Sequence, residues 1–227
     1  MLVPSPSTNP LHYAVILTHG ATGNMNNTQL QTISQYLTTK GFICLRFTYI
    51  SSRVENRMKA YHAVVEFLQN YKEVSLKGCF VAGRSMGSRA AVCVANAMKN
   101  DFIKGVICLS YPLHPPRKLT SLRNEILQSL TTPTLFITGT KDAFCTKTIM
   151  EDTLKSITCV KKMKWIEGAD HSINIKGQTD NGVMVDVCDE IYDWCLKHVT
   201  RETQLKRPAE TKDCNNDSGK KKKCKST

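Results

Sequence analysis

The stretch Cys79-Phe80-Val81-Ala82-Gly83-Arg84-Ser85-Met86-Gly87-Ser88-Arg89-Ala90-Ala91 changes character twice over a short distance. It begins as an apolar run, typical of a buried strand, and ends as a run of small residues, typical of a buried helix. Between the two lies Gly83-x-Ser85-x-Gly87, which predicts a sharp turn with a serine at its apex. Glycine suits the flanking positions because side chains there would clash across so tight a turn.

A serine at this apex has a structural and a chemical interpretation. Structurally, it is a helix N-cap whose hydroxyl satisfies a free backbone N–H group. Chemically, it is a nucleophile held above the edge of a sheet, with the N-terminus of a helix facing a developing oxyanion. The chemical interpretation requires that the rest of the chain supply a base and an acid.

Composition limits the class of protein. The chain has 227 residues, of which 41% are hydrophobic, enough for one large α/β domain. It contains no apolar run of about 18 residues, so no membrane insertion is predicted. The ten cysteines show no C-x-x-C pair and no metal-ligand spacing, which indicates reduced core thiols in an intracellular protein. No metal site and no cofactor are predicted.

The pattern of the chain predicts three segments. Residues 1–12 are proline-rich and read as an extended lead-in without the features of a signal peptide. Over residues 13–204, apolar strand-like runs alternate six times with helix-like runs, which predicts a doubly wound, mostly parallel sheet of about six strands. Only residues 111–132 separate two of these strands, so we expect no lid domain. Residues 205–227 form a basic tail that we expect to be disordered.

Two loops that follow predicted strands carry the candidate partners of Ser85. Asp142 follows the strand predicted at 134–139, and His171 follows the one predicted at 160–166. The chain order Ser85, Asp142, His171 is the order found in α/β hydrolases. In this hypothesis His171 takes the proton of the Ser85 hydroxyl, and Asp142 orients the imidazole. Asp170 is interpreted as a turn former rather than as the acid.

Further residues near the expected site have predicted roles. The oxyanion donors are predicted to be the backbone N–H groups of Met86 and Ala21, since each follows a strand next to the turn. Arg84 and Arg46 flank the expected mouth of the site. They either bind an anionic group of a substrate or form structural ion pairs.

Four strings carry a resemblance to a known family: 19–26 (HGATGNMN), 83–91 (GRSMGSRAA), 109–115 (LSYPLHP) and 171–173 (HSI). They resemble the α/β-hydrolase-like domain of the testis-expressed protein 30 family, which is shared with a subunit of the NSL histone-acetyltransferase complex. The resemblance covers residues 13–200 and implies an α/β-hydrolase fold, related to dienelactone hydrolases. Family members usually begin with an additional β-hairpin, which implies a shortened sheet edge near Val3-Pro4.

The basic tail resembles a bipartite nuclear localisation signal. Two basic clusters flank a spacer, residues 208–219, and the tail holds eight basic and three acidic residues. The clusters are Lys206, Arg207 and then Lys220, Lys221, Lys222 and Lys223. A nuclear import receptor is the partner that such a signal implies. The alternatives are a solvated tail that aids solubility, or attraction to nucleic acid or anionic lipid.

Two functions therefore remain open. The first is a serine hydrolase, similar to carboxylesterases or thioesterases, that acts on esters, thioesters or related acyl substrates. The alternative is a catalytically silent module that binds proteins of a chromatin-associated complex. The signal in the tail predicts a protein of nucleus and cytoplasm. Neither the identity of the acyl substrate nor the oligomeric state is predicted.

Overall fold

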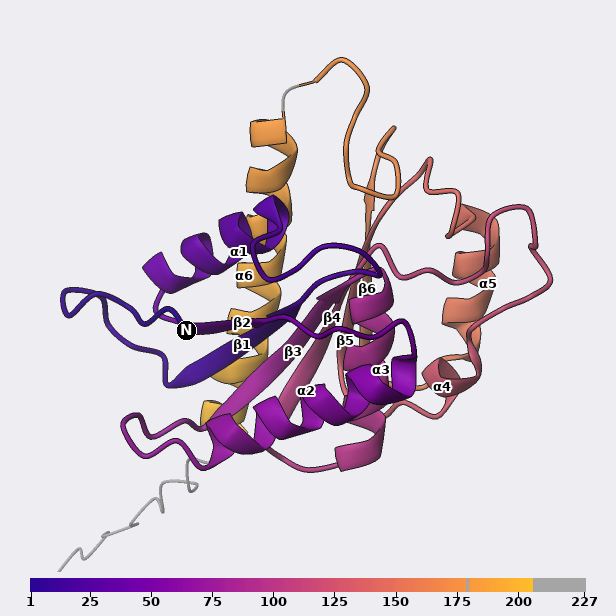
Figure 1. Cartoon of the computed structure of the whole chain (residues 1–227). Coiled ribbons are helices and arrows are strands. Elements are labelled where there is room, and N and C mark those ends of the chain that lie inside the picture. The colour runs from indigo at the N-terminus through magenta and orange to yellow at the C-terminus, as the bar shows by residue number, and fades with distance from the viewer. Residues whose placement is uncertain (179, 206–227) are drawn as a thin grey trace, which may run out of the picture.

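The computed structural model describes residues 1–178 and 180–205, and strands alternate with helices along its whole length (Figure 1). The tail residues Lys206, Arg207 and Lys220 to Lys223 lie outside the described residues. In chain order the elements are β1 (Tyr13–Thr18), α1 (Thr28–Thr39), β2 (Ile43–Phe47), α2 (Val54–Gln69), β3 (Gly78–Arg84), α3 (Met86–Met98), β4 (Ile103–Leu109), α4 (Glu125–Gln128), β5 (Thr134–Gly139), α5 (Lys147–Ser156), β6 (Lys161–Ile166) and α6 (Asp180–Leu205).

The six strands form one parallel sheet in the order β2-β1-β3-β4-β5-β6. The chain moves from β1 to β2 in one direction, then returns to β3 and continues in the other direction. The predicted doubly wound sheet of six strands is thus confirmed. In such sheets ligands bind where the winding reverses, here at the carboxyl ends of β1 and β3. Thr18 of β1 lies opposite Gly83 of β3, so the loops that follow these two strands are neighbours.

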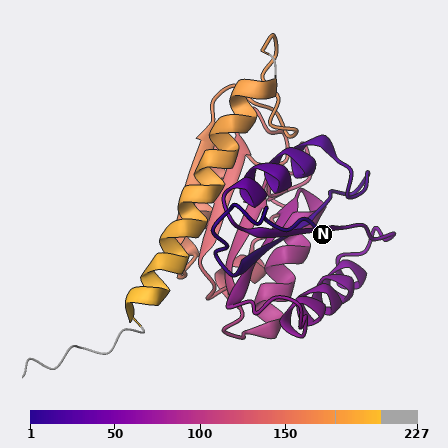
Figure 2. The ribbon, with the colours of Figure 1, turned by 90° about the vertical axis from the view of Figure 1, so that its left-hand side faces the viewer.

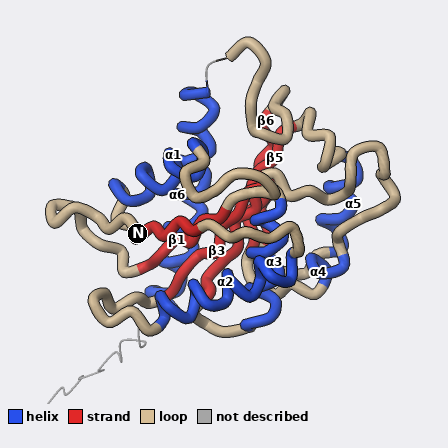
Figure 3. Tube along the Cα trace, in the orientation of Figure 1, coloured by secondary structure: helices blue, strands red, loops and turns tan. Residues whose placement is uncertain are grey.

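Helices cover both faces of the sheet (Figures 2 and 3). Along β1, Val15 and Leu17 pack into the core shared with α1 and α6, while Ala14 and Ile16 pack into the core shared with α2 and α3. All four are fully buried. Burial on both faces explains why the central strands are continuous apolar runs rather than alternating ones.

The chain between β4 and β5 contains α4 and loops, which agrees with the prediction of no lid domain. The helix in this segment, α4, is short, with four residues. Arg123 donates its N–H to the carbonyl of Leu113 at 2.7 Å and accepts from the hydroxyl of Tyr111 at 2.8 Å. These contacts with the loop after β4 occupy backbone groups that a longer helix would use.

The proline-rich lead-in adds to the edge of the sheet. Leu2 forms an antiparallel bridge with Cys44 of β2, with backbone N–H to carbonyl distances of 2.8 and 2.9 Å in the two directions. The N-terminal residues thus cover part of the exposed edge of β2, which would otherwise present unpaired backbone groups.

The cysteines of the described chain are free thiols, and most of them are buried. Burial raises the pKa of Cys44 and of Cys145 to about 12, so both are neutral core side chains. Among the described residues, no group of three or more His, Cys, Asp or Glu side chains is placed to hold a metal ion. None of the described helices has both the length and the apolar character that crossing a membrane requires.

Candidate active site

Ser85 occupies the turn between β3 and α3, in a strained backbone conformation with φ of 52° and ψ of −118°. Both flanking glycines are sterically required. A Cβ at Gly83 would lie 2.2 Å from the carbonyl carbon of Gly87, and a Cβ at Gly87 would lie 2.6 Å from the carbonyl oxygen of His19. Ser85 occupies the N-cap position of α3, but its side chain makes no capping hydrogen bond, so the hydroxyl does not serve as a cap.

The hydroxyl of Ser85 lies within hydrogen-bonding distance of a histidine, and the other nitrogen of that histidine contacts a carboxylate. His171 Nε2 is 2.9 Å from Ser85 Oγ, and His171 Nδ1 is 2.8 and 2.9 Å from the two carboxylate oxygens of Asp142. The Asp142 side chain is fully buried, whereas 21% of the His171 side chain is exposed. The structure therefore brings together three residues that are widely separated in the sequence.

Asp142 is held by the turn that follows β5. Its Oδ1 accepts a hydrogen bond from the backbone N–H of Phe144 at 2.8 Å. The ring of Phe144 packs against the imidazole of His171, with the ring centroids 4.4 Å apart. Phe144 could not be recognised from the sequence, because a single aromatic residue in a loop carries no periodic signal.

The loop that carries His171 is shaped by Asp170. One carboxylate oxygen of Asp170 accepts from the backbone N–H groups of Ser172, at 2.8 Å, and of Asn174, at 3.1 Å. These contacts are those of a turn-forming aspartate.

The two predicted oxyanion donors belong to different segments of the chain. Met86 begins α3, and Ala21 lies in the exposed loop after β1. Within the described part of the chain, neither backbone N–H makes a hydrogen bond to another protein group. A Cβ at Gly20 would be 3.4 Å from the Cβ of Ser85, so the loop after β1 lies directly against the nucleophile candidate.

Arg84 donates hydrogen bonds to the His171 loop and to α1, and not to an acidic side chain of the described residues. Its Nη2 donates to Ser172 Oγ at 2.9 Å, and its Nε donates to Gln29 Oε1 at 3.0 Å. Gln29 in turn donates to the carbonyl of Ser172. Burial lowers the pKa of Arg84, partly offset by the charges of Asp142 and Asp170.

Arg46 lies farther out, where its Nη1 donates to the carbonyl of Met25 at 2.7 Å. Within the described residues neither Arg46 nor Arg84 forms an ion pair, so the interpretation as structural ion pairs is wrong. Binding of an anionic substrate group by either arginine stays a prediction.

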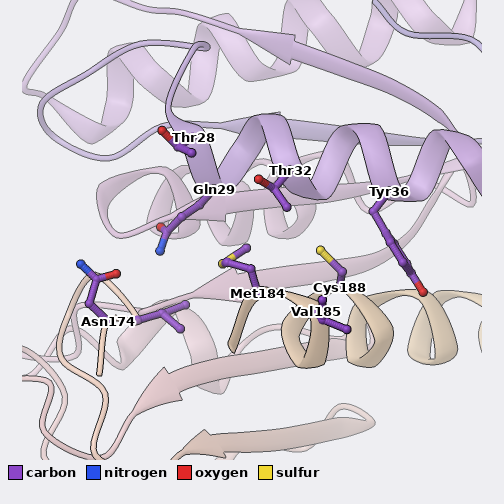
Figure 4. A pocket seen from close by; sticks show the side chains of 9 residues that line it. Thr28, Gln29, Thr32, Tyr36, Asn174, Met184, Val185 and Cys188 are labelled. Atoms are coloured by element: carbon purple, nitrogen blue, oxygen red, sulfur yellow. The ribbon is translucent and has the colours of Figure 1, made fainter. Parts of the chain in front are cut away.

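A cavity of about 320 Å³ adjoins the far end of the His171 loop, between α1 and α6 (Figure 4). Figure 4 shows Met184, Cys188 and Thr32 among the side chains that line it. Gln29 also lines it, and so connects the cavity to Arg84 and the His171 loop. None of Ser85, Asp142 and His171 lines this cavity.

His19 is a buried neutral histidine at the end of β1. Its Nε2 accepts from the backbone N–H of Tyr49 at 3.3 Å, so the proton resides on Nδ1, which donates to the carbonyl of Gly20 at 2.9 Å. Burial lowers the pKa of His19, and the nearby charge of Arg57 lowers it further, against the opposing effect of the bond to Gly20. Protonation of Nε2 would break the bond from Tyr49 and disturb the loop.

This arrangement predicts a loss of stability in mild acid. The pKa of His19 is lower in the folded than in the unfolded protein, so the unfolded state binds more protons below pH of about 6.5. The free energy of unfolding should therefore decrease as the pH falls from about 6.5 towards the folded pKa. Urea denaturation at pH 7.0 and 5.0 should show a smaller decrease for His19→Asn, which does not titrate. Parallel curves for the two proteins would contradict the prediction.

Comparison with known proteins identifies the same type of domain. The profile of a family described as alpha/beta hydrolase domain matches residues 12–198. The match spans every strand of the sheet and the loops that hold Ser85, Asp142 and His171.

Solved structures share the fold at low sequence identity. Est1E from Butyrivibrio proteoclasticus, determined with bound ferulic acid, superposes with a TM-score of 0.70 at 17% identity, over 87% of this chain and 93% of that one. A dienelactone hydrolase from Anabaena variabilis gives 0.68 at 17% identity, over 86% and 88%. XC6422 from Xanthomonas campestris, described as a serine hydrolase without lid, gives 0.64 at 16% identity, over 91% and 88%.

Proposed function

Because the chain belongs to the alpha/beta hydrolase domain family, we propose that it is a serine hydrolase that acts on esters, thioesters or related acyl compounds. The observation that carries this proposal is the continuous hydrogen-bonded chain from Ser85 through His171 to Asp142. Acyl transfer to a serine requires this arrangement, in which the hydroxyl contacts one imidazole nitrogen and the carboxylate contacts the other at hydrogen-bonding distance. The dienelactone hydrolase and the serine hydrolase without lid among the structural neighbours are consistent with this reaction class.

In the proposed reaction, Ser85 Oγ attacks the acyl carbon while His171 Nε2 accepts the hydroxyl proton. Asp142 on the Nδ1 side stabilises the imidazolium that forms. The bond from the acyl carbon to the leaving oxygen or sulfur then breaks, and His171 gives its proton to the leaving group. Water, activated by the same imidazole, releases the acid and restores Ser85.

The proposed oxyanion hole consists of the backbone N–H groups of Met86 and Ala21. Both N–H groups lack a hydrogen-bond partner in the described protein, which is what a site reserved for a substrate oxygen requires. Ser85 and His171 are both partly exposed, and α4 is the only helix in the segment where a lid could be inserted. An open site of this kind suits substrates with bulky groups on either side of the acyl carbon.

Replacement of Asp142 tests whether the three side chains act as a unit. Asn at this position presents its amide where the carboxylate accepts from Nδ1, which favours the wrong tautomer of His171. We expect Asp142→Asn to lower the rate of Ser85 labelling by a fluorophosphonate, and kcat for p-nitrophenyl esters, by about 10³–10⁴-fold. Parallel assays with oxygen esters and thioesters of the same acid would identify the preferred leaving group.

Asp170→Asn is the matched control, because it makes the same chemical change on a nearby carboxylate that accepts hydrogen bonds from backbone N–H groups. We expect it to keep more than about a tenth of the activity. Equal activities of the two variants, or wild-type activity of Asp142→Asn, would refute the assignment of Asp142.

A second candidate function is favoured by the tail sequence. We propose that Lys206 and Arg207 with Lys220 to Lys223 form a bipartite signal recognised by a nuclear import receptor. Together with the resemblance to the testis-expressed protein 30 family, this supports a role as a protein-binding module of a chromatin-associated complex. A protein-binding module that needs no catalysis should keep its protein partners in the Ser85→Ala variant. Loss of the partners by a folded Ser85→Ala variant would contradict this second function.

The nuclear signal has a direct test. Replacing Lys220 to Lys223 with alanine removes the larger basic cluster, so the full chain fused to a fluorescent protein should shift to the cytoplasm. The control replaces Lys161, Lys162 and Lys164 of β6, which removes three positive charges from the folded domain instead. An unchanged distribution of the tail variant would refute the signal.

A further inference from the structure

Arg57, in the first turn of α2, is the largest of the fully buried side chains, with 1% of its surface exposed. Its guanidinium donates to four backbone carbonyl groups: Nη1 to Gly20 at 2.8 Å and to His19 at 3.3 Å, Nη2 to Ala21 at 3.2 Å, and Nε to Ser51 at 2.5 Å. Three of these acceptors are consecutive residues of the loop that lies against Ser85. The guanidinium is thus bound to the loop backbone on several sides.

The buried charge of Arg57 is stabilised without an acidic partner from the described residues. Within the described residues no carboxylate pairs with Arg57, and its guanidinium carbon lies 4.3 Å from the ring centroid of Tyr49. A cation at the N-terminal end of a helix also opposes the helix dipole. Burial of an unpaired cation is unfavourable for folding, so carbonyl groups and an aromatic face are what stabilise this one. Stability alone would be served better by an apolar side chain of similar size.

The contacts also determine the direction of a backbone N–H group. The carbonyl of Gly20 and the N–H of Ala21 belong to one planar trans peptide, in which they point in opposite directions. Arg57 Nη1 and His19 Nδ1 both bind that carbonyl, which directs the N–H of Ala21 away from the guanidinium. The positive charge of the guanidinium beside this carbonyl also polarises the peptide and makes its N–H group a stronger hydrogen-bond donor.

We propose that Arg57 is the positioning residue of the oxyanion hole, which orients and polarises the N–H of Ala21 through the carbonyl of Gly20. This inference rests on the proposed hydrolase function. Arg57 touches no substrate atom and acts only through the peptide that it holds. Its contribution is therefore realised when negative charge develops on the substrate oxygen, and not when the substrate binds.

The test compares wild type, Arg57→Met and Arg57→Lys in the hydrolysis of p-nitrophenyl butyrate, with kcat expressed per active site titrated with a fluorophosphonate. We expect kcat of Arg57→Met to fall about 10²-fold with KM changed by less than about threefold. The inhibition constant of phenylboronic acid, which forms a tetrahedral anion on the serine, should rise by a similar factor. Arg57→Lys, which keeps the charge but not the forked donors, should lie between the two.

Arg123→Met is the matched control, because Arg123 is also partly desolvated and donates to a backbone carbonyl, that of Pro112, which does not belong to the loop that Arg57 binds. It should keep kcat within about threefold of wild type. A folded Arg57→Met with wild-type kcat, or a fall shared equally with Arg123→Met, would overturn the inference.

If Arg57→Met does not fold, as judged by circular dichroism, Arg57→Lys provides the test. Wild-type values of kcat and boronate affinity would overturn the inference, and a selective loss of kcat would support it.

The result also separates the role of Arg57 from the proposed hydrolase function. If the fluorophosphonate labels wild type no better than Ser85→Ala, the hydrolase function itself is refuted, and the role of Arg57 with it. Active wild type with unaffected Arg57 variants would refute only the role of Arg57.

Discussion

Replacing Ser85 with alanine is expected to abolish labelling by a fluorophosphonate and to lower kcat for activated esters by about 10⁵–10⁶-fold. Alanine has no oxygen to form the acyl intermediate, and His171 has no hydroxyl proton to accept. The measurements are gel-based labelling and hydrolysis of p-nitrophenyl esters at neutral pH. Because this change removes the bond-forming atom itself, its effect should exceed that of Asp142→Asn.

Ser110→Ala provides the matched control for this variant. Ser110 directly follows the neighbouring strand β4, also has a positive φ, of 50°, and is fully buried. Its hydroxyl has no hydrogen-bond partner among the described residues, so its loss should affect neither stability nor labelling. Both variants should melt within a few degrees of wild type, since alanine keeps the backbone geometry of serine. Equal labelling of wild type and Ser85→Ala would refute the proposed reaction.

A large effect on both stability and activity is expected from Gly139→Ala, at the end of β5. A Cβ on Gly139 would lie 2.1 Å from the carbonyl oxygen of Ala169, and this neighbour is backbone that cannot rotate away. Gly139 precedes the turn of Asp142, and Ala169 precedes His171, so the methyl group would push the acid and the base apart. We expect the free energy of unfolding to fall by about 1–3 kcal/mol. Esterase activity should fall by about 10²-fold or more, because small displacements of reacting groups have large effects.

Gly182→Ala distinguishes this steric effect from the general effect of adding a methyl group. Gly182 lies near the start of α6, with no atom within 4 Å of its Cβ position. Alanine should therefore be neutral there, or stabilise the helix by up to about 1 kcal/mol. Thermal unfolding of both variants, followed by circular dichroism, is the measurement. A melting temperature of Gly139→Ala equal to that of wild type would contradict the close approach of the two loops.

The fold could be predicted from the sequence because its signals are local and repeated. Each buried strand is a continuous apolar run, such as Tyr13–Thr18, and the predicted six-stranded architecture is confirmed. Local signals do not record contacts between loops, such as those of Arg123 with Tyr111 and Leu113.

The sequence by itself determined the order of strands and helices, the turn at Ser85, and which loops hold Asp142 and His171. Those features depend on backbone sterics and hydrophobic periodicity, which neighbouring residues express directly. Only the tertiary structure decided the polar partners: Arg57 under the loop after β1, and Arg84 bound to Gln29 and Ser172 instead of to a carboxylate. A hydrogen bond to a backbone carbonyl places no demand on residue type at the acceptor, so no pattern in the sequence marks it. These contacts exist only once the sheet has brought distant loops to one edge.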